Sequence, residues 1–209
     1  MLRSELIERV IRNVFGGQPT DDASITANLV NKFIEDGCAI AAKANYKDSI
    51  QLDGVTYVNN SFYTTYKGIT FSNDEKFAYV ATLPKIPLGL GKNEGIASLR
   101  VKDGSGNVSL DALPLSENQW TYYQSMPMIP NKLLYKPEGI FVYVLSVLQL
   151  NVGYTANITM VSSGDDTNLS SVLNVPQDYI PIIFDYCVKA LMQQRAAPKD
   201  IVNDGEDNV

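Results

Sequence analysis

The chain changes its hydrophobic pattern twice, because helical spacing at both ends encloses a long middle part with the pattern of β-strands. In the first part, apolar residues recur at helical spacing over residues 2–14 and again from Ile25 to about Tyr46. Gly16 and Gly17 separate these two stretches. The sequence therefore predicts a helical hairpin with a long second arm.

A further helix is predicted near the other end, from Asp178 as N-cap to about Ala197, where Pro198 follows. Its apolar residues lie on two sides, whereas a helix on the surface of a monomer usually has one narrower apolar face. The first side comprises Ile180, Ile183, Phe184, Cys187 and Leu191. The second side comprises Tyr179, Ile182, Tyr186 and Ala190. Either the helix is covered on both sides within its own domain, or the second side contacts another subunit.

Between the helical ends, β-branched and aromatic residues alternate with clusters of turn residues such as Asp53-Gly54. Strands are expected within residues 55–71 and over 76–83, 95–102, 108–115, 119–123, 132–135, 139–150 and 154–162. Short strands at this spacing predict an antiparallel sandwich or barrel. The expected fold class is therefore α+β, with the N-terminal hairpin and the C-terminal helix packed together and an antiparallel β domain inserted between them.

The same patterns predict the domain organisation. Residues 1–48 and 175–198 are expected to form one helical domain, and residues 49–163 the inserted β domain. Residues 164–174 are expected to be a linker, and residues 199–209 an acidic C-terminal tail.

Composition argues against most catalytic chemistry. None of the 209 residues is histidine, the side chain most often used for proton transfer and metal binding near neutral pH. The two cysteines, Cys38 and Cys187, fall in predicted helices, and we expect them to be core thiols in a reducing compartment. We therefore expect no enzyme activity, no cofactor and no bound metal.

Charge and hydropathy restrict the partners. The 17 basic and 23 acidic side chains give a net charge of −6, whereas proteins that bind nucleic acid freely usually have a basic surplus. We expect no specific DNA binding, since an acidic surface repels phosphates. The chain starts directly with a charged amphipathic pattern, and no apolar run approaches the length of a membrane span. We expect neither secretion nor contact with a membrane.

Two glycine-containing segments resemble ligand loops only in part. Gly89-Leu90-Gly91-Lys92-Asn93 lacks both the earlier glycine and the following hydroxyl residue of a phosphate-binding loop. The segment Asp103-Gly104-Ser105-Gly106-Asn107 starts like a calcium loop, but proline replaces the required glutamate at Pro114. Both segments are predicted to be turns.

An aromatic cluster at Trp120, Tyr122 and Tyr123 has two interpretations. It could be a platform on which a sugar stacks. Aromatic residues in a predicted strand more often pack in a core, and we favour that interpretation.

The segment after Pro198 cannot build a core, because it is mostly acidic and polar. It contains Asp200, Ile201, Val202, Asp204, Glu206 and Asp207. We expect these residues either to dock on a partner protein or to form a solvated tail.

The layout resembles that of a phage neck protein. The helical start, the inserted β region and the closing segment Pro176-Gln177-Asp178-Tyr179-Ile180-Pro181, continued by the helix to Arg195, are similar to the head-to-tail connector proteins of short-tailed phages. These adaptor or ring proteins include those of crAss-like gut phages. The resemblance covers most of the chain as a layout, but only the last helix as residues.

The resemblance implies a structural virion protein that assembles in the bacterial cytoplasm. Such subunits form a homo-oligomeric ring, typically twelvefold, below the portal protein, and DNA passes through the axial channel. The C-terminal segment commonly reaches toward the portal, and no catalytic residue is required. Two alternatives stay open: another neck or tail part, such as a stopper or tail-hub subunit, or a carbohydrate-binding β module with helical ends.

Overall fold

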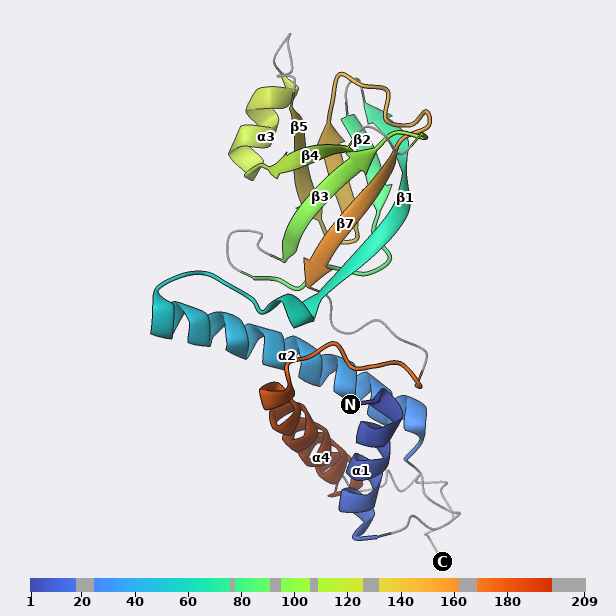
Figure 1. Cartoon of the computed structure of the whole chain (residues 1–209), viewed down its shortest axis with the longest axis vertical. Helices are drawn as coiled ribbons and strands as arrows, with labels where there is room; N and C mark the ends of the chain where they lie inside the picture. Colours follow the sequence, from blue (N-terminus) through green and yellow to red (C-terminus); the bar gives the residue numbers. More distant parts are fainter. Residues whose placement is uncertain are drawn as a thin grey trace, which may run out of the picture. The chain divides into compact units, whose positions relative to one another are not determined.

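The computed structural model describes residues 1–17, 25–75, 78–90, 95–105, 109–125, 132–161 and 169–196 (Figure 1). Over these residues the chain has helices at both ends and a central seven-stranded β-barrel, which confirms the α+β class. The chain divides into two compact units. Residues 1–41 and 166–209 make up the helical unit, and residues 42–165 make up the barrel unit.

Helix α1 spans Arg3–Phe15 and forms where the first apolar repeat predicts it. Its buried face consists of Arg3, Leu6, Ile7, Val10 and Val14. The helix ends at Gly16, whose left-handed φ of 68° suits a residue without a side chain. The backbone N–H of Gly17 then donates to the Arg12 carbonyl at 2.9 Å, which satisfies one of the last carbonyls of the helix.

Helix α2 spans Ala27–Asp53 and is longer than predicted. The buried stripe that identifies it in the sequence ends at Ala42, but no glycine or proline interrupts the chain until Gly54. Gly54 adopts a left-handed φ of 68°, and its N–H donates to the Ile50 carbonyl at 3.1 Å. The helix therefore continues beyond the predicted end at Tyr46, because the residues up to Asp53 still favour a helix although few of them are buried.

Helix α4 spans Ile180–Ala196 and is preceded by the 3₁₀ turn η3, Gln177–Tyr179. The prediction of Asp178 as N-cap is wrong, because this residue lies inside the turn and Pro176 caps it. The N–H of Tyr179 donates to the Pro176 carbonyl at 3.1 Å. Pro181 falls in the first turn of α4, where no backbone donor is needed.

The helices of the helical unit pack closely. Helix α1 contacts α4, and the Arg9 guanidinium lies 5.5 Å from the centre of the Phe184 ring. Helix α2 approaches α4 at Gly37, where a Cβ atom would lie only 2.9 Å from Cγ2 of Ile183. Helices approach this closely only where a residue lacks a side chain, so Gly37 permits the crossing.

The first residues of the chain are fixed by the segment before α4. Backbone N–H groups of Arg3 and Leu173 donate to the carbonyls of Ser171 and Met1, at 2.9 and 3.1 Å. Arg3 is buried, and its Nη1 donates to Oδ1 of Asn31 on α2 at 2.9 Å. This hydrogen bond ties α1 to α2 inside the helical unit.

The barrel unit contains a closed sheet with the strand order β1-β2-β6-β5-β4-β3-β7 (Figure 1). The strands are β1 (Tyr63–Glu75), β2 (Ala78–Thr82), β3 (Ile96–Lys102), β4 (Ser109–Pro114), β5 (Leu133–Glu138), β6 (Phe141–Leu145) and β7 (Thr155–Val161). A short 3₁₀ helix, η1 (Asn60–Phe62), precedes β1. Of the two predicted architectures, the barrel is the one that forms.

Alternate residues of each strand face the barrel core. In β7, for example, Ala156, Ile158 and Met160 are fully buried while the residues between them are partly exposed. This alternation is the period-2 pattern expected of a strand with one buried face. Phe71, Leu99, Val142 and Val144 contribute to the same core from other strands.

Two sequence predictions in the barrel unit are wrong. Residues Gln119–Tyr123 are not a strand but lie in helix α3, Glu117–Gln124. The N–H of Ser116 donates to the Gln119 side chain at 3.1 Å, so the segment Ser116–Gln119 is a capping box that starts the helix. In addition, β4 and β5 are parallel, so the sheet is not fully antiparallel. Helix α3 is the crossover that a parallel pair needs.

Candidate functional site

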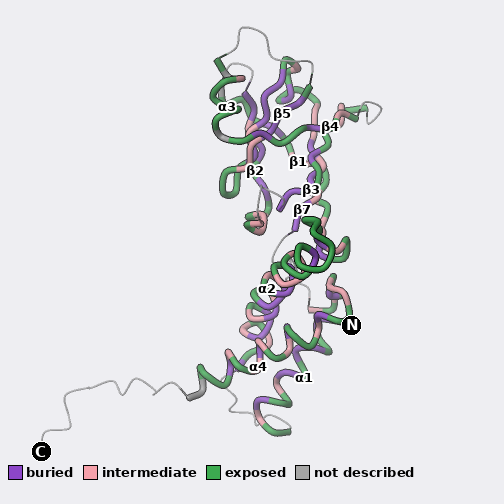
Figure 2. Tube along the Cα trace, turned by 90° about the vertical axis from the view of Figure 1, so that its left-hand side faces the viewer, coloured by how far each residue is buried: buried purple, intermediate pink, exposed green. Residues whose placement is uncertain are grey.

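The predicted second side of α4 is only partly covered within the helical unit. Figure 2 shows buried, intermediate and exposed residues alternating along this helix. On the first side Ile183, Cys187 and Leu191 are fully buried, whereas Ile180 and Phe184 are half-buried. On the second side Ile182 is 40% exposed, and Tyr186 and Ala190 are half-buried. These three residues follow each other at intervals of four, so they form one continuous stripe along the helix. We call Ile182, Tyr186 and Ala190 the α4 stripe.

Tyr179 differs from the other three residues predicted for this side. It lies in the 3₁₀ turn before α4 and is buried. Its side chain therefore offers little surface to another subunit. Met192, near the end of α4, is 47% exposed and does not belong to the predicted second side.

The charges around the α4 stripe are partly neutralised. Nζ of Lys189 lies 3.2 Å from Oδ2 of Asp185. These two residues are one helical turn apart and flank the α4 stripe on one side. Burial raises the pKa of the Tyr186 hydroxyl, and the carboxylate of Asp36 on α2 acts in the same direction. The stripe is thus apolar and uncharged, with a paired polar margin.

The predicted docking residues of the C-terminal segment lie outside the described residues. They are Asp200, Ile201, Val202, Asp204, Glu206 and Asp207.

Among the described residues, no group of three or more His, Cys, Asp or Glu side chains is placed to hold a metal ion. The segment 103–105 leads out of β3, which pairs with β4 in antiparallel register, as expected of a hairpin turn. Oδ2 of Asp103 accepts a hydrogen bond from the Ser105 hydroxyl at 2.8 Å. Residues 91–93 of the glycine-containing segment 89–93 lie outside the described residues.

Both cysteines are free thiols buried in the helical unit. Burial raises the pKa of Cys38 to about 12, although Arg3 acts in the opposite direction. Burial, together with Cys38, raises the pKa of Cys187 to about 12 as well. A thiol is a nucleophile or a metal ligand only as thiolate, so neither cysteine is activated.

This leads to a prediction for alkaline pH. Both thiols have an ordinary pKa of 9.0 and a folded-state pKa of about 12. Burial favours the protonated thiol. The free energy of unfolding of the helical unit should therefore be highest below pH 9, and should fall as the pH rises from 9 toward 12. Each thiol should contribute a slope of about 1.4 kcal/mol per pH unit in this window. Amide exchange of α4 between pH 8 and 11 measures it, and Cys38→Ala should flatten the slope.

Thiol labelling gives the control for this prediction. Neither cysteine should react with an aromatic disulfide reagent at pH 8 until the helical unit unfolds. Rapid labelling of the folded protein would contradict the assignment of both residues as core thiols.

The aromatic cluster on α3 is mainly part of a core. Trp120 is buried, and its ring lies edge-to-face with Tyr143 at 6.3 Å between centroids. Nζ of Lys136 lies 5.5 Å from the centre of the same ring. Tyr122 is 60% exposed and contacts Tyr123. The indole is therefore covered, and Tyr122 is the exposed aromatic residue of the cluster.

Comparison with known proteins adds no family. No protein-family model and no curated protein matches this chain. The helices of the described residues include none with the length and hydropathy needed to cross a membrane.

Proposed function

We propose that this chain is a structural virion protein that forms an oligomeric ring in a phage neck. The ring joins the portal to the tail and lines the channel through which DNA passes. The observation that carries this proposal is the α4 stripe, which the helical unit leaves partly uncovered although Ile183, Cys187 and Leu191 on the first side are fully buried. Apolar surface of this kind is typical of subunit contacts.

The charge of the chain supports the place of DNA in this proposal. A net charge of −6 disfavours binding to phosphates, and DNA that moves through a channel must not adhere to its wall. In this proposal the subunits contact the portal protein and adjacent ring or tail proteins, and no catalytic residue or cofactor takes part. The acidic segment Asp200–Asp207 docks on the portal or on the adjacent ring.

The alternatives differ in their partners. A stopper or tail-hub subunit would bind an adjacent ring without the portal, so reconstitution with portal alone separates it from an adaptor. A carbohydrate-binding module would need exposed aromatic side chains. Burial of Trp120 disfavours this alternative, and a glycan-array experiment that includes Tyr122→Ala tests it.

The α4 stripe is tested by placing a charge on it. Ile182→Asp and Tyr186→Asp should each weaken ring assembly about tenfold or more, because each would bury an unpaired carboxylate between subunits. Ile182→Asp should change thermal stability little, since Ile182 is 40% exposed. Tyr186→Asp should lower it somewhat, because Tyr186 is half-buried and the new carboxylate would lie near that of Asp36. Asn28→Asp is the matched control, because this exposed position in the first turn of α2 tolerates the same added charge.

Assembly is measured by sedimentation velocity and electron microscopy of the complex reconstituted with portal. A chain ending at Pro198 serves as a second sample, which should keep the ring and lose portal binding. If both α4 variants assemble like the wild type and lose only thermal stability, the stripe is internal and the proposed interface is wrong.

A further inference from the structure

The end of α2 and the segment after it form an exposed apolar tip. All eight residues 50–57 are exposed, and Figure 2 shows this end of the helix in green. We call residues 50–57 the arm tip. Its four large apolar side chains are Ile50, Leu52, Val55 and Tyr57. Leu52 has the largest exposed fraction of the four, 83%. Large apolar side chains clustered on a surface mark an interaction site.

The geometry of the arm tip suits insertion into another surface. Helix α2 has 27 residues and is therefore about 40 Å long, and Gly54 reverses the chain at its end. Asp53 is the single charged residue of the tip. Within the part of the chain that the structure describes, Asp53 has no ion-pair partner.

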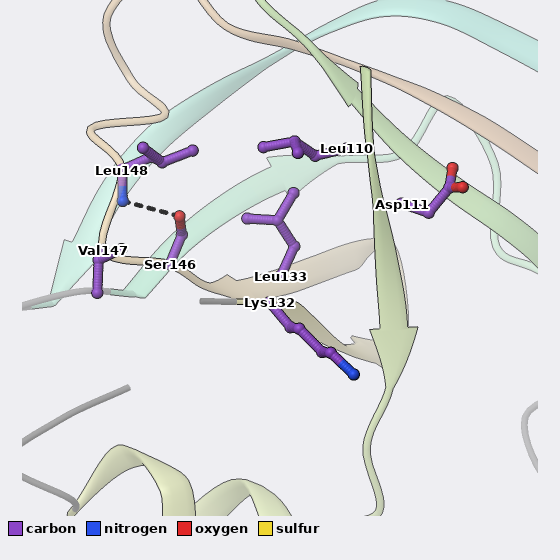
Figure 3. A pocket seen from close by; sticks show the side chains of 7 residues that line it. All are labelled: Leu110, Asp111, Lys132, Leu133, Ser146, Val147 and Leu148. Atoms are coloured by element: carbon purple, nitrogen blue, oxygen red, sulfur yellow. Dashed lines mark hydrogen bonds between the residues drawn. The ribbon is translucent and has the colours of Figure 1, made fainter. Parts of the chain in front are cut away.

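A pocket of about 420 Å³ opens in the wall of the barrel unit (Figure 3). Described residues that line it come from β4, from the start of β5 and from the segment after β6. They are Leu110, Asp111, Lys132, Leu133, Ser146, Val147 and Leu148. The side chains of Leu110, Leu133 and Leu148 point toward one another and give the pocket an apolar floor. A volume of this size accepts several side chains.

We call this the barrel pocket; of the two charged lining residues that the structure describes, Asp111 is paired with a neighbouring side chain and Lys132 is not. Asp111 points away from the leucines, and its carboxylate accepts a hydrogen bond from Nε of Arg100 at 2.7 Å. Lys132 is exposed at the edge of the pocket and forms no ion pair with any residue that the structure describes. Val147, also at the edge, is 48% exposed.

We infer that the arm tip of one copy inserts into the barrel pocket of the next copy. The two surfaces match in chemistry: the tip is apolar with one carboxylate, and the pocket is apolar with one ammonium group. Leucine and β-branched side chains of the tip fill the leucine-lined floor, and Asp53 pairs with Lys132 at the edge. This inference rests on the proposed function, because it names the surfaces through which the copies assemble.

The contact is head-to-tail, because it joins two different surfaces. In an open row of copies, one end keeps a free tip and the other end a free pocket until a ring closes. A face-to-face dimer would instead use the same patch on both copies and would stop at two subunits. Tip-to-pocket insertion therefore accounts for assembly into a ring.

The test uses two kinds of defective chain. Leu52→Asp disables the tip, and Val147→Asp disables the pocket; each should reduce the association constant about tenfold or more by placing a carboxylate against apolar side chains. A mixture of the two chains should form dimers through the remaining intact tip and pocket, and should then stop. Ile86→Asp is the matched control, because the exposed fraction of Ile86 lies between those of Leu52 and Val147 and Ile86 belongs to neither surface.

A charge exchange tests the ion pair separately. Asp53→Lys and Lys132→Asp should each weaken association, and both changes in one chain should restore it. Sedimentation velocity over a range of concentrations measures every sample. If Leu52→Asp and Val147→Asp assemble like the wild type while Ile182→Asp does not, the inference is wrong and the proposed ring stands. If the wild type stays monomeric with and without portal, both are wrong.

Discussion

Replacing Gly37 with leucine is expected to lower the free energy of unfolding of the helical unit by about 3 kcal/mol or more. A Cβ atom at this position would lie 2.9 Å from Cγ2 and 3.4 Å from Cα of Ile183. Ile183 is fully buried on a helix, where a β-branched side chain has essentially one rotamer and cannot turn away. The helices would therefore have to separate, which opens the contact between α2 and α4. Urea unfolding combined with amide exchange of α4 measures the loss.

Gly37→Ala provides the sharper comparison for the same contact. Alanine gains up to about 1 kcal/mol of helix propensity, but its methyl group meets Ile183. On an Ile183→Ala background the nearest clash disappears, so Gly37→Ala should become neutral or stabilising. If Gly37→Ala has the same effect on both backgrounds, the two helices do not touch at this point.

Local signals predicted most helices of the fold. Helix α1 begins and ends within a residue or two of its apolar repeat, because Gly16 supplies an unambiguous end. The signal for α3 was also present, as Ser116 and Gln119 stand three residues apart, the spacing of a capping box. The aromatic residues after Ser116 favoured a strand instead, and tertiary packing of Trp120 outweighs that preference.

Strand pairing could not be predicted in the same way. A sandwich and a barrel both bury alternate residues, so the pattern of Ala156, Ile158 and Met160 fits either. The parallel pairing of β4 with β5 depends on α3 crossing between them, and a segment interpreted as a strand gives no such crossover.

The candidate interface was predicted in part. The division of α4 into two apolar sides follows from helical spacing alone, and on the first side Ile183, Cys187 and Leu191 are fully buried. Tyr179 does not follow the spacing, because a 3₁₀ turn rotates each residue by more than an α-helix does. The arm tip was missed because Val55 and Tyr57 look like the start of a strand, whereas β1 begins only at Tyr63.

The second large effect is expected at the buried arginine of the helical unit. Asn31→Leu should lower the free energy of unfolding by about 3 kcal/mol, because it removes the acceptor of a buried guanidinium. Arg3 is only 3% exposed, and its Nη1 donates to Oδ1 of Asn31 at 2.9 Å. Nε of Arg3 is also buried and has no hydrogen-bond partner among the described residues, so little else compensates the charge.

Arg3→Met should lower the free energy of unfolding by less than Asn31→Leu does, although arginine is the larger of the two side chains replaced. Methionine keeps the volume of the aliphatic stem and removes the buried charge itself. The double variant Arg3→Met/Asn31→Leu should therefore be more stable than Asn31→Leu alone. Asn28→Leu, one turn earlier and exposed, is the matched control and should stay within about 0.5 kcal/mol of the wild type. Equal losses for Asn31→Leu and the double variant would contradict a charge-driven cost.

Amide exchange distinguishes stability from positioning in these variants. The backbone N–H groups of Arg3 and Leu173 bond to the carbonyls of Ser171 and Met1, which aligns the start of the chain with the segment leading into α4. A buried guanidinium fixed by Asn31 holds residue 3 in this register, whereas a methionine side chain has no directional bond. In Arg3→Met we therefore expect the amides of residue 3 and Leu173 to exchange faster than in the wild type, while amides of α4 keep their protection. Unchanged exchange at both positions would mean that packing alone sets the register.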